Sequence, residues 1–536
     1  MSEFPSRFQI RAPLLLSLAM AAGMFIGRQM NGSGLRPPLF LSGKAQTEAR
    51  ALQEVIQYIS WLYVDEVNTD SLNKGAIERL LAGLDPHSAY LPPGSRELFE
   101  EEMEGGFVGI GIEFILINDT IHVVTPIHGG PAERAGILSG DRIIRIADSL
   151  VAGVQMDWVA IARMLRKQRG EKVGISLLRR GERQLRHFQV VCEHIPLKSV
   201  ETAYALDAGT IYVKINKFAA QTGSEFIGAL HDLIPQGQPA NLILDLRGNP
   251  GGLVESAITV LNQLFVGGKL LLYTKSRNGE KREYKSNGRA HARINNVVVL
   301  VDEGSASASE IVAGAVQDHD RGWIVGRRTF GKGLVQEQYP LANGGALRLT
   351  VARYYTPSGR CIQRDYRDRV AYEAEAAYRR MNGGLSERPP VALPDSAVFY
   401  TGLGREVYAG GGIYPDAVIP IDTVRFNDFY YEARQYAPQY AEIFKANLPD
   451  PRSSQKSLTV NDVQLADFLS YLRSEGVDFE DSEYRDCKEE LRRLLLALAY
   501  RTASDQTAYY RTLNEADPVM LKALDLIKRG PPTGDE

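Results

Sequence analysis

Three serines, a lysine and a glutamine lie between positions 301 and 336, and their residue types could support nucleophilic attack on a carbonyl group. They are Ser305, Ser307, Ser309, Lys332 and Gln336. A serine hydroxyl attacks a carbonyl when a neighbouring base accepts its proton. A lysine can be that base if burial favours its neutral form and lowers its pKa towards the working pH. The first chemistry to consider is therefore hydrolysis by a serine–lysine pair.

The surrounding sequence predicts the elements that hold these residues. The apolar run Val297–Val301 predicts a buried strand, and the small residues Gly304–Ala308 predict a tight turn. Apolar residues at helical spacing predict a helix over Ser309–Gln317. A serine at such a junction lies at a helix N-terminus, where free backbone N–H groups can stabilise a developing oxyanion. The run Trp323–Val325 predicts another strand, which leads to the glycine-bracketed Lys332.

The same spacing also has a purely structural explanation. Ser307 and Glu310 fit the capping box S-x-x-E, in which a serine only closes a helix end. Lys332 between two glycines could equally be a solvated loop residue. Because capping boxes are common, spacing alone favours the structural role.

A resemblance reverses that balance. The segment GSASASEI, followed by VG and TFGKG..Q, resembles the signature of the carboxyl-terminal processing (tail-specific) proteases, which are serine peptidases with a Ser–Lys dyad. The resemblance implies that Ser307, the middle serine of SASAS, is the nucleophile. It also implies that Lys332 is the general base and that Gln336 orients the lysine. Ser305 and Ser309 are then turn and first-turn residues.

A second glycine-rich turn follows the apolar strand predicted at Ala240–Leu246. It reads RGNPGG and precedes a helix predicted at Leu253–Phe265. Paired glycines allow positive φ and close backbone approach, and no G-x-x-x-x-G-K-[ST] phosphate loop is present. In the protease family the motif LR.NPGG supplies one oxyanion donor, and the N–H that follows the nucleophile supplies the other. The resemblance thus implies donors at Ala308 and at either Gly251 or Gly252.

Residues 101–185 resemble a PDZ domain. Three landmarks occur in order: the loop Gly109-Ile110-Gly111-Ile112, then GGPAERAGI, then GDRIIRI. In PDZ domains the N–H groups of such a loop capture a peptide C-terminus, and the adjacent strand edge pairs with the peptide. A helix over Trp158–Lys167 would flank this groove. The family resemblance also aligns Arg166 with an arginine that couples peptide binding to activation, although Arg163 and Arg169 are close neighbours.

Residues 1–31 predict an export signal or a membrane anchor. Arg7 and Arg11 precede the apolar run 12–27, and polar sequence follows. The run is short for a spanning helix, which needs about 20 apolar residues, although about 17 can suffice. Since no convincing A-x-A-like cleavage site follows, an uncleaved anchor is favoured over a cleaved signal. The basic flank would stay cytoplasmic, so we expect a bacterial cell-envelope protein that faces the periplasm or is exported.

The remaining segments give the other domain boundaries. Residues 45–100 predict helices that close on LDPHSAYL, a motif also found at the front of the processing proteases, and His87 within it is expected to be structural.

Residues 196–424 alternate strands and helices, which predicts an α/β core with a sheet covered on both faces. Within the core, 365–399 is an insertion, for which a surface excursion is favoured over a wall of the substrate tunnel. Residues 425–536 predict a helical domain, either an oligomerisation or partner module or a capping bundle.

Composition excludes other classes of site and partner. The chain has 536 residues, with 62 Lys and Arg against 65 Asp and Glu, so no nucleic-acid surface is expected. Its three cysteines are far apart, and neither they nor the histidines have the spacing of a disulfide framework or a zinc site. We expect no metal and no cofactor.

Together these observations predict a multidomain α/β protein. Its parts are N-terminal helices, a PDZ domain, a crotonase- or ClpP-like protease core and a C-terminal helical domain. We expect a serine endopeptidase whose PDZ domain recognises accessible protein C-termini, and the terminal helical regions could support a homo-oligomer. The alternative is a catalytically silent PDZ scaffold, because related folds host non-catalytic members. A crotonase-type hydratase would instead need glutamate acid/base groups and no PDZ domain.

Overall fold

The computed structural model describes residues 43–179, 181–381, 397–445, 459–502 and 505–533. The chain divides between Ile77 and Glu78 into two compact units, each of which is described by itself. Among the described residues, no helix is both long enough and apolar enough to span a membrane. The predicted anchor at 12–27 lies outside the described residues.

The N-terminal unit is built around the helix α2 (Gly43–Leu62), and α3 (Thr69–Leu81) begins within it. The α2 helix occupies the region predicted to be helical. Several of its large apolar side chains are nevertheless exposed: Leu52, Val55, Tyr58, Trp61 and Leu62. A contiguous exposed apolar stripe of this kind is typical of an interaction site.

The second unit contains a small antiparallel sheet in the order β3-β4-β5-β7-β8. Its elements are β3 (Ile112–Ile117), β4 (Thr120–Pro126), α5 (Pro131–Ala135), β5 (Arg142–Ile146), β6 (Ser149–Leu150), α6 (Trp158–Leu165), β7 (Lys172–Leu178) and β8 (Arg186–Val191). Because β3 is an edge strand, its outer backbone groups can pair with an added peptide strand. The α6 helix ends at Leu165, earlier than predicted, so Arg166 has an extended backbone just beyond it.

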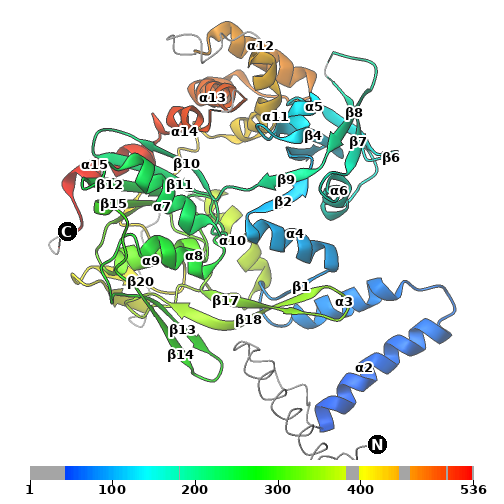
Figure 1. Ribbon diagram of the computed structural model, residues 1–536, viewed down its shortest axis with the longest axis horizontal. Helices are drawn as coiled ribbons and strands as arrows, with labels where there is room; N and C mark the ends of the chain where they lie inside the picture. Colours follow the sequence, from blue (N-terminus) through cyan, green and yellow to red (C-terminus); the bar gives the residue numbers. More distant parts are fainter. Residues whose placement is uncertain (1–42, 180, 382–396, 446–458, 503–504, 534–536) are drawn as a thin grey trace, which may run out of the picture. The chain divides into compact units, whose positions relative to one another are not determined.

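The centre of the second unit is a six-stranded sheet in the order β10-β11-β12-β15-β16-β21 (Figure 1). The strands are β10 (Val200–Ala205), β11 (Thr210–Ile215), β12 (Pro239–Asp245), β15 (Arg293–Val301), β16 (Trp323–Gly326) and β21 (Ala417–Val418). Only β10 is antiparallel to its neighbour. In β15, Val297 and Val299 face one hydrophobic core, whereas Val298 and Leu300 face another. The sheet is therefore covered on both faces, as predicted.

Helices cover the two faces of this sheet. The helices α7 (Thr222–Leu233), α8 (Val254–Leu261) and α9 (Ala308–Asp318) contribute to the hydrophobic core on one face. The last helix, α15 (Pro518–Arg529), contributes Met520 and Leu526 to the core on the other face. The C-terminal region thus completes the core rather than standing apart from it.

A second sheet in this unit carries the segment around the predicted catalytic lysine. Its central strand is β18 (Ala346–Tyr355), which pairs with β17 (Leu334–Pro340), β13 (Leu270–Ser276) and β1 (Ala89–Leu91). The hairpin partner of β13 is β14 (Lys281–Lys285). The strand β1 belongs to the LDPHSAYL segment, which the sequence assigned only to a proline turn after a helix. Its pairing with β18 ties that segment to this second sheet.

The C-terminal helices contact the small antiparallel sheet and the six-stranded central sheet. The helices α11 (Asp428–Lys445), α12 (Asp462–Ser474) and α13 (Asp481–Thr502) share a hydrophobic core, and α14 (Gln506–Asn514) leads to α15. From α11, Gln439 bonds to the His122 ring of β4 at 2.8 Å. From α13, Arg501 pairs with Glu113 of β3 at 2.7 Å. These helices therefore link the small sheet to the core.

Candidate active site

The predicted strand, turn and helix around Ser307 are present, and Ser307 lies at the sharpest point of the turn. The strand β15 ends at Val301, and α9 begins at Ala308 with Ser307 as its N-cap. The Ser307 backbone has φ 53° and ψ −111°, a combination that non-glycine residues seldom adopt. Such strain persists only where surrounding contacts enforce it, and it concentrates at functional sites. Nucleophile elbows use a strained strand-to-helix turn of this kind to expose a serine hydroxyl.

The three serines of SASAS have different environments. Ser305 and Ser309 are fully buried. Their hydroxyls donate to the carbonyls of Leu246 at 2.8 Å and Asn249 at 2.9 Å. Ser307 is partly exposed. The outer two serines therefore fasten the turn to the neighbouring loop, and Ser307 is the serine that a substrate can reach.

The buried carboxylate of Glu310 joins the turn at Ser307 to the turn at Lys332. One oxygen accepts hydrogen bonds from the backbone N–H groups of Ser307 at 2.8 Å and Lys332 at 2.9 Å. The other accepts from the Thr329 hydroxyl at 2.5 Å and the Gly331 N–H at 2.7 Å. Burial raises the pKa of Glu310, and these hydrogen bonds act against that rise. Sequence reasoning assigned Glu310 only to a capping box and so missed its role as a bridge.

Lys332 is partly buried in the turn that Glu310 holds. Its Nζ donates to Gln336 Oε1 at 3.1 Å, so the predicted lysine and glutamine are in contact. Desolvation, followed by the positive charge of Arg348, lowers the pKa of Lys332 to about 8. Near that pH a large fraction of the amine is neutral, which is the form that can accept a proton.

A backbone carbonyl of the LDPHS loop orients Gln336. The Gln336 Nε2 donates to the His87 carbonyl at 2.5 Å, which leaves Oε1 directed to Lys332. The loop is fixed by the Asp85 carboxylate, which accepts from the His87 N–H at 2.9 Å. Burial, followed by the charge of Lys332, lowers the pKa of His87 to about 4, so its ring is neutral at neutral pH. The contact agrees with the structural role predicted for His87.

The insertion reaches this loop through α10 (Arg369–Met381). Tyr372 is buried, and its hydroxyl lies 2.6 Å from His87 Nε2. The Arg364 guanidinium packs against the rings of both Phe330 and Tyr372, at 4.1 and 3.7 Å from their centroids. Most described side chains of α10 are exposed, but Tyr372 packs on residues beside the lysine turn. Most of the insertion beyond α10 lies outside the described residues.

Gly251 packs directly against the nucleophile turn. Its φ is 97°, and a Cβ there would lie 2.8 Å from both Ala308 N and Ser307 Cβ, so only glycine fits. The Gly251 N–H donates to the Asn249 side-chain oxygen at 2.9 Å. As an oxyanion donor, Gly251 would first have to release Asn249.

Gly252, the other predicted donor, has a different arrangement. It forms a parallel bridge with Phe218, but the hydrogen bonds of that bridge use Gly251 O and Leu253 N. The Gly252 N–H takes no part in them. Ala308 is the first residue of α9, a position whose N–H has no acceptor within the helix.

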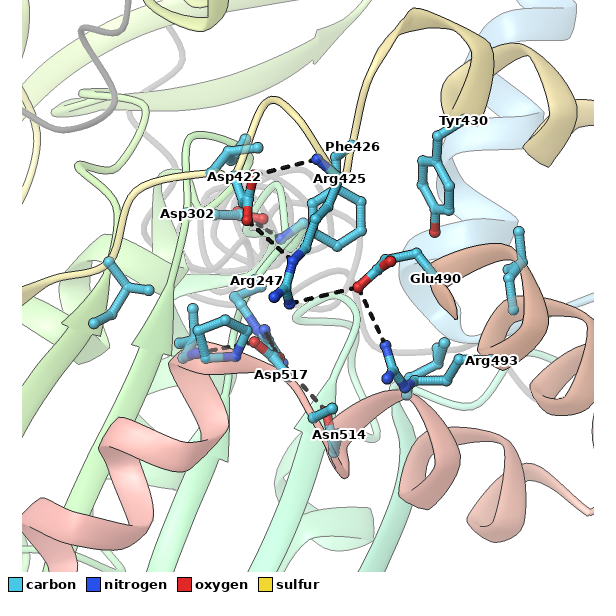
Figure 2. Close-up of a pocket in the computed structure, with 18 of the residues that line it drawn as sticks. Arg247, Asp302, Asp422, Arg425, Phe426, Tyr430, Glu490, Arg493, Asn514 and Asp517 are labelled. Atoms are coloured by element: carbon cyan, nitrogen blue, oxygen red, sulfur yellow. Dashed lines mark hydrogen bonds and ion pairs between the residues drawn. The ribbon is translucent and has the colours of Figure 1, made fainter. Parts of the chain in front are cut away.

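Arg247 and Gly248 of this glycine-rich loop line a cavity of about 430 Å³ to which residues of the C-terminal helices also contribute (Figure 2). Arg247, the first residue of the loop, pairs with Asp245 at 2.6 Å and also with Asp517, the N-cap of α15. The Gly248 N–H donates to the Asp302 carboxylate at 2.8 Å. The C-terminal domain is thus tied by an ion pair to the loop that carries Gly251 and Gly252.

The predicted peptide groove is present as a cavity in this structure. A cavity of about 600 Å³ is lined by the loop that precedes β3, by β3 itself and by α6. Gly109 ends β2 (Gly106–Gly109), and Gly111 has φ 74°, which produces the sharp turn before Ile112. Ile110 and Ile112 line the cavity together with Leu165 of α6. The predicted loop and helix therefore flank one groove.

Arg166 lies at one side of this cavity. It pairs with Glu101 of α4 (Pro93–Glu104), and its guanidinium lies 4.1 Å from the centroid of the Phe107 ring. Arg163 instead packs against Gly94 at the start of α4. Of these two neighbouring arginines, Arg166 is the one that lines the groove.

Comparison with known proteins identifies the family. A family model described as a PDZ domain matches residues 108–190, and one described as peptidase family S41 matches residues 209–371. A carboxy-terminal-processing protease of Bartonella bacilliformis is 35% identical over 313 residues, which cover 58% of this chain and 71% of the relative. The chain belongs to the carboxy-terminal processing proteases. A processing protease of Bacillus subtilis is 32% identical to this protease over 316 residues, covering 58% of this chain and 65% of the relative.

Among solved structures, the photosystem II D1 C-terminal processing protease is 31% identical to this protease. The match covers 59% of this chain and 90% of that one, with a TM-score of 0.35. The protease is a serine-type peptidase with a PDZ domain, an S41 core and helical parts at both ends. The predicted family and fold class are confirmed. Membership of this family favours the peptidase over the hydratase and scaffold alternatives.

Proposed function

We propose that this protease cleaves exported proteins with a Ser–Lys dyad formed by Ser307 and Lys332, with Gln336 orienting the lysine. The observation that carries the proposal is the single Glu310 oxygen that accepts from the backbone of both Ser307 and Lys332. That contact keeps together two turns that are distant in the sequence. The strained backbone of Ser307 and the lowered pKa of Lys332 give further support.

In the proposed mechanism, neutral Lys332 accepts the proton of Ser307 as the hydroxyl attacks the scissile carbonyl. The protonated amine then gives that proton to the leaving amino group. Water hydrolyses the acyl-enzyme with Lys332 again acting as base. The oxyanion would be stabilised by the N–H of Ala308 and by a second glycine amide. Gly251 packs against Ser307 but would first have to exchange its Asn249 partner, whereas the Gly252 N–H takes no part in the bridge to Phe218.

We also propose that the PDZ groove selects substrates by their accessible C-termini. The terminal carboxylate would bind the N–H groups of the Gly109–Ile112 loop, and the tail would pair with the β3 edge. Ile110, Ile112 and Leu165 make that end of the groove apolar, which favours an aliphatic last residue. Arg166 would transmit binding by exchanging its Glu101 partner for the bound tail.

The dyad is tested by incubating the full-length protein with an unfolded protein and identifying the products by mass spectrometry. Ser307→Ala should abolish cleavage and leave folding intact. Ser305→Ala should remain active, with a lowered melting temperature because a buried hydrogen bond is lost. If both variants are equally folded and lose activity equally, the assignment of Ser307 rather than Ser305 as the nucleophile is excluded.

Location and assembly form a separate proposal. The basic flank and apolar run within residues 1–31 support an anchor or export signal that leaves the protease facing the periplasm. The exposed apolar stripe on α2, which includes Leu52, Val55 and Trp61, supports pairing with a second copy. Deleting residues 1–31 should release the protein from the membrane fraction, and Val55→Glu with Trp61→Glu should lower the mass measured by light scattering. If the truncated protein stays in the membrane fraction, the anchor proposal is refuted. If the double variant keeps the same mass, the proposal of pairing through α2 is refuted.

A further inference from the structure

Arg348 is a positively charged side chain that lines the peptide groove. It belongs to β18 and lines the same cavity of about 600 Å³ as the Gly109–Ile112 loop and α6. Its guanidinium lies 4.2 Å from the centroid of the Phe99 ring. Among the residues that the structure describes, no carboxylate pairs with it.

The other two cations that line this cavity are already paired. Arg166 pairs with Glu101, and Lys217 pairs with Glu102 at 3.2 Å. An unpaired, partly desolvated guanidinium carries a free-energy cost that a bound carboxylate would relieve. The Arg348 guanidinium is therefore the group in this cavity that is best suited to bind an anion.

The position of Arg348 relates the peptide groove to the chemistry. Its charge is the second-largest cause of the lowered pKa of Lys332, so the two cations interact. The same side chain lines the cavity at the groove. Arg348 thus lines the surface that would hold the substrate tail and is near enough to the proposed base to lower its pKa.

We propose that Arg348 is a carboxylate-binding subsite for the substrate. This inference rests on the proposed peptidase function and adds a specificity-determining residue to it. A guanidinium binds a carboxylate with two parallel N–H···O bonds, and stacking on Phe99 fixes the plane of the fork. The carboxylate is either the C-terminal group of the tail or an Asp or Glu side chain near it. Both sources present the same chemistry to Arg348.

Binding of labelled tail peptides to the Ser307→Ala protein separates the two sources without relying on catalysis. One peptide has a free C-terminus and a nearby Glu, a second replaces that Glu by Gln, and a third carries a C-terminal amide. Each is titrated by fluorescence anisotropy against protein with Arg348 or with Arg348→Gln. We expect Arg348→Gln to weaken the first peptide about tenfold, because hydrogen bonds between charged partners are the strong ones. Arg348→Gln should not weaken binding of the peptide that lacks the carboxylate bound by Arg348. That peptide therefore identifies whether the carboxylate is the C-terminus or the Glu side chain.

Two further variants separate recognition from packing. Arg348→Lys keeps the charge but loses the planar fork, so its affinity should lie between those of Arg348 and Arg348→Gln. Arg353→Gln changes an exposed arginine on the same strand and should leave affinity unchanged. In the active enzyme, Arg348→Gln should also move the acid limb of the pH–rate profile to higher pH, since a positive charge beside Lys332 is lost.

The proposal is overturned if Arg348→Gln weakens all three peptides equally, or weakens none of them. It is also overturned if no tail binds the Ser307→Ala protein. Equal weakening would mean that Arg348 only packs on Phe99. Loss of cleavage activity by itself has no bearing on this outcome, because the binding measurement uses a protein without the nucleophile.

Discussion

The turn at Ser307 and the PDZ groove are stabilised by different kinds of contact. Around Ser307, the side chains of Ser305, Ser309 and Glu310 are fully buried and bonded within the core. Around the groove, contacts are partly exposed, as in the pair between Arg166 and Glu101. Buried hydrogen-bonded groups are costly to disturb, whereas exposed ion pairs contribute about 0 to 1 kcal/mol and exchange readily.

The difference separates two tasks of one enzyme. Catalysis gains from groups that are already in place when the transition state forms. Recognition needs partners that can be replaced as a tail enters, and Phe114 stacked on Trp158 at 4.4 Å across the groove is such a contact. Substitutions at the turn should therefore lower kcat, and substitutions at the groove should change KM.

The largest effect is expected for Lys332→Arg. A guanidinium cannot be deprotonated at working pH, so the base is lost while the charge remains. We expect kcat to fall by about a thousandfold or more, in line with removal of a general base. Lys281→Arg changes an exposed lysine of β14 and is the matched control. Measurable turnover by Lys332→Arg, assayed with an unfolded protein substrate, would remove the lysine from the mechanism.

Glu310→Gln should have the next largest effect. The amide replaces one acceptor oxygen by a donor that faces backbone N–H groups, so the nucleophile and lysine turns lose their common anchor. We expect kcat to fall by about a hundredfold, with little change in tail affinity. Stopped-time cleavage assays and tail titrations measure the two quantities, and Glu337→Gln on β17 is the control. A change in KM alone would contradict the assignment of catalysis to the Ser307 turn and of substrate recognition to the PDZ groove.

Tyr372→Phe tests the contact between the insertion and the LDPHS loop. It removes the hydroxyl that lies 2.6 Å from the His87 ring, while the backbone carbonyl that holds Gln336 remains. One hydrogen bond to a positioning loop predicts a fall in kcat of about fivefold. Glu373→Gln, on the exposed face of the same helix, should behave like the unmodified protein. If Tyr372→Phe and Glu373→Gln lower kcat equally, the loss of the hydroxyl contact with His87 is not the cause of the lower rate.

The smallest effect is expected at the groove. Glu101→Gln removes the partner of Arg166 and leaves that arginine available to a substrate carboxylate. KM for a tailed substrate should fall by about threefold at most, because the pair is partly exposed. The measurement is a full rate–concentration curve. A change confined to kcat would place Arg166 with the nucleophile turn instead.

Much of the local structure could be predicted from the sequence. The helix α9 and the strand β12 lie within a residue of their predicted bounds, because apolar periodicity and flanking turns are local signals. Helix ends were less accurate, as for α6, since terminal turns fray and caps decide them. The choice of Ser307 among three identical side chains came from the motif, not from spacing.

The contacts that join distant segments could not be predicted in this way. Nothing in the local pattern indicates that Glu310 bonds to Gly331, or that β1 pairs with β18. The helix α10 has the composition of an exposed helix, and only its packing reveals Tyr372 as a neighbour of His87. Such contacts depend on how the layers pack, which a single-sequence pattern does not encode.

The pH dependence of kcat/KM tests the Ser–Lys account most directly, because it reports the essential groups of the free enzyme. Lys332 must lose its proton to act, so the rate should rise with pH and be half-maximal near the pKa of about 8. A half-maximal rate near the ordinary histidine pKa of about 6.5, or a rate independent of pH across this range, would contradict lysine as the base.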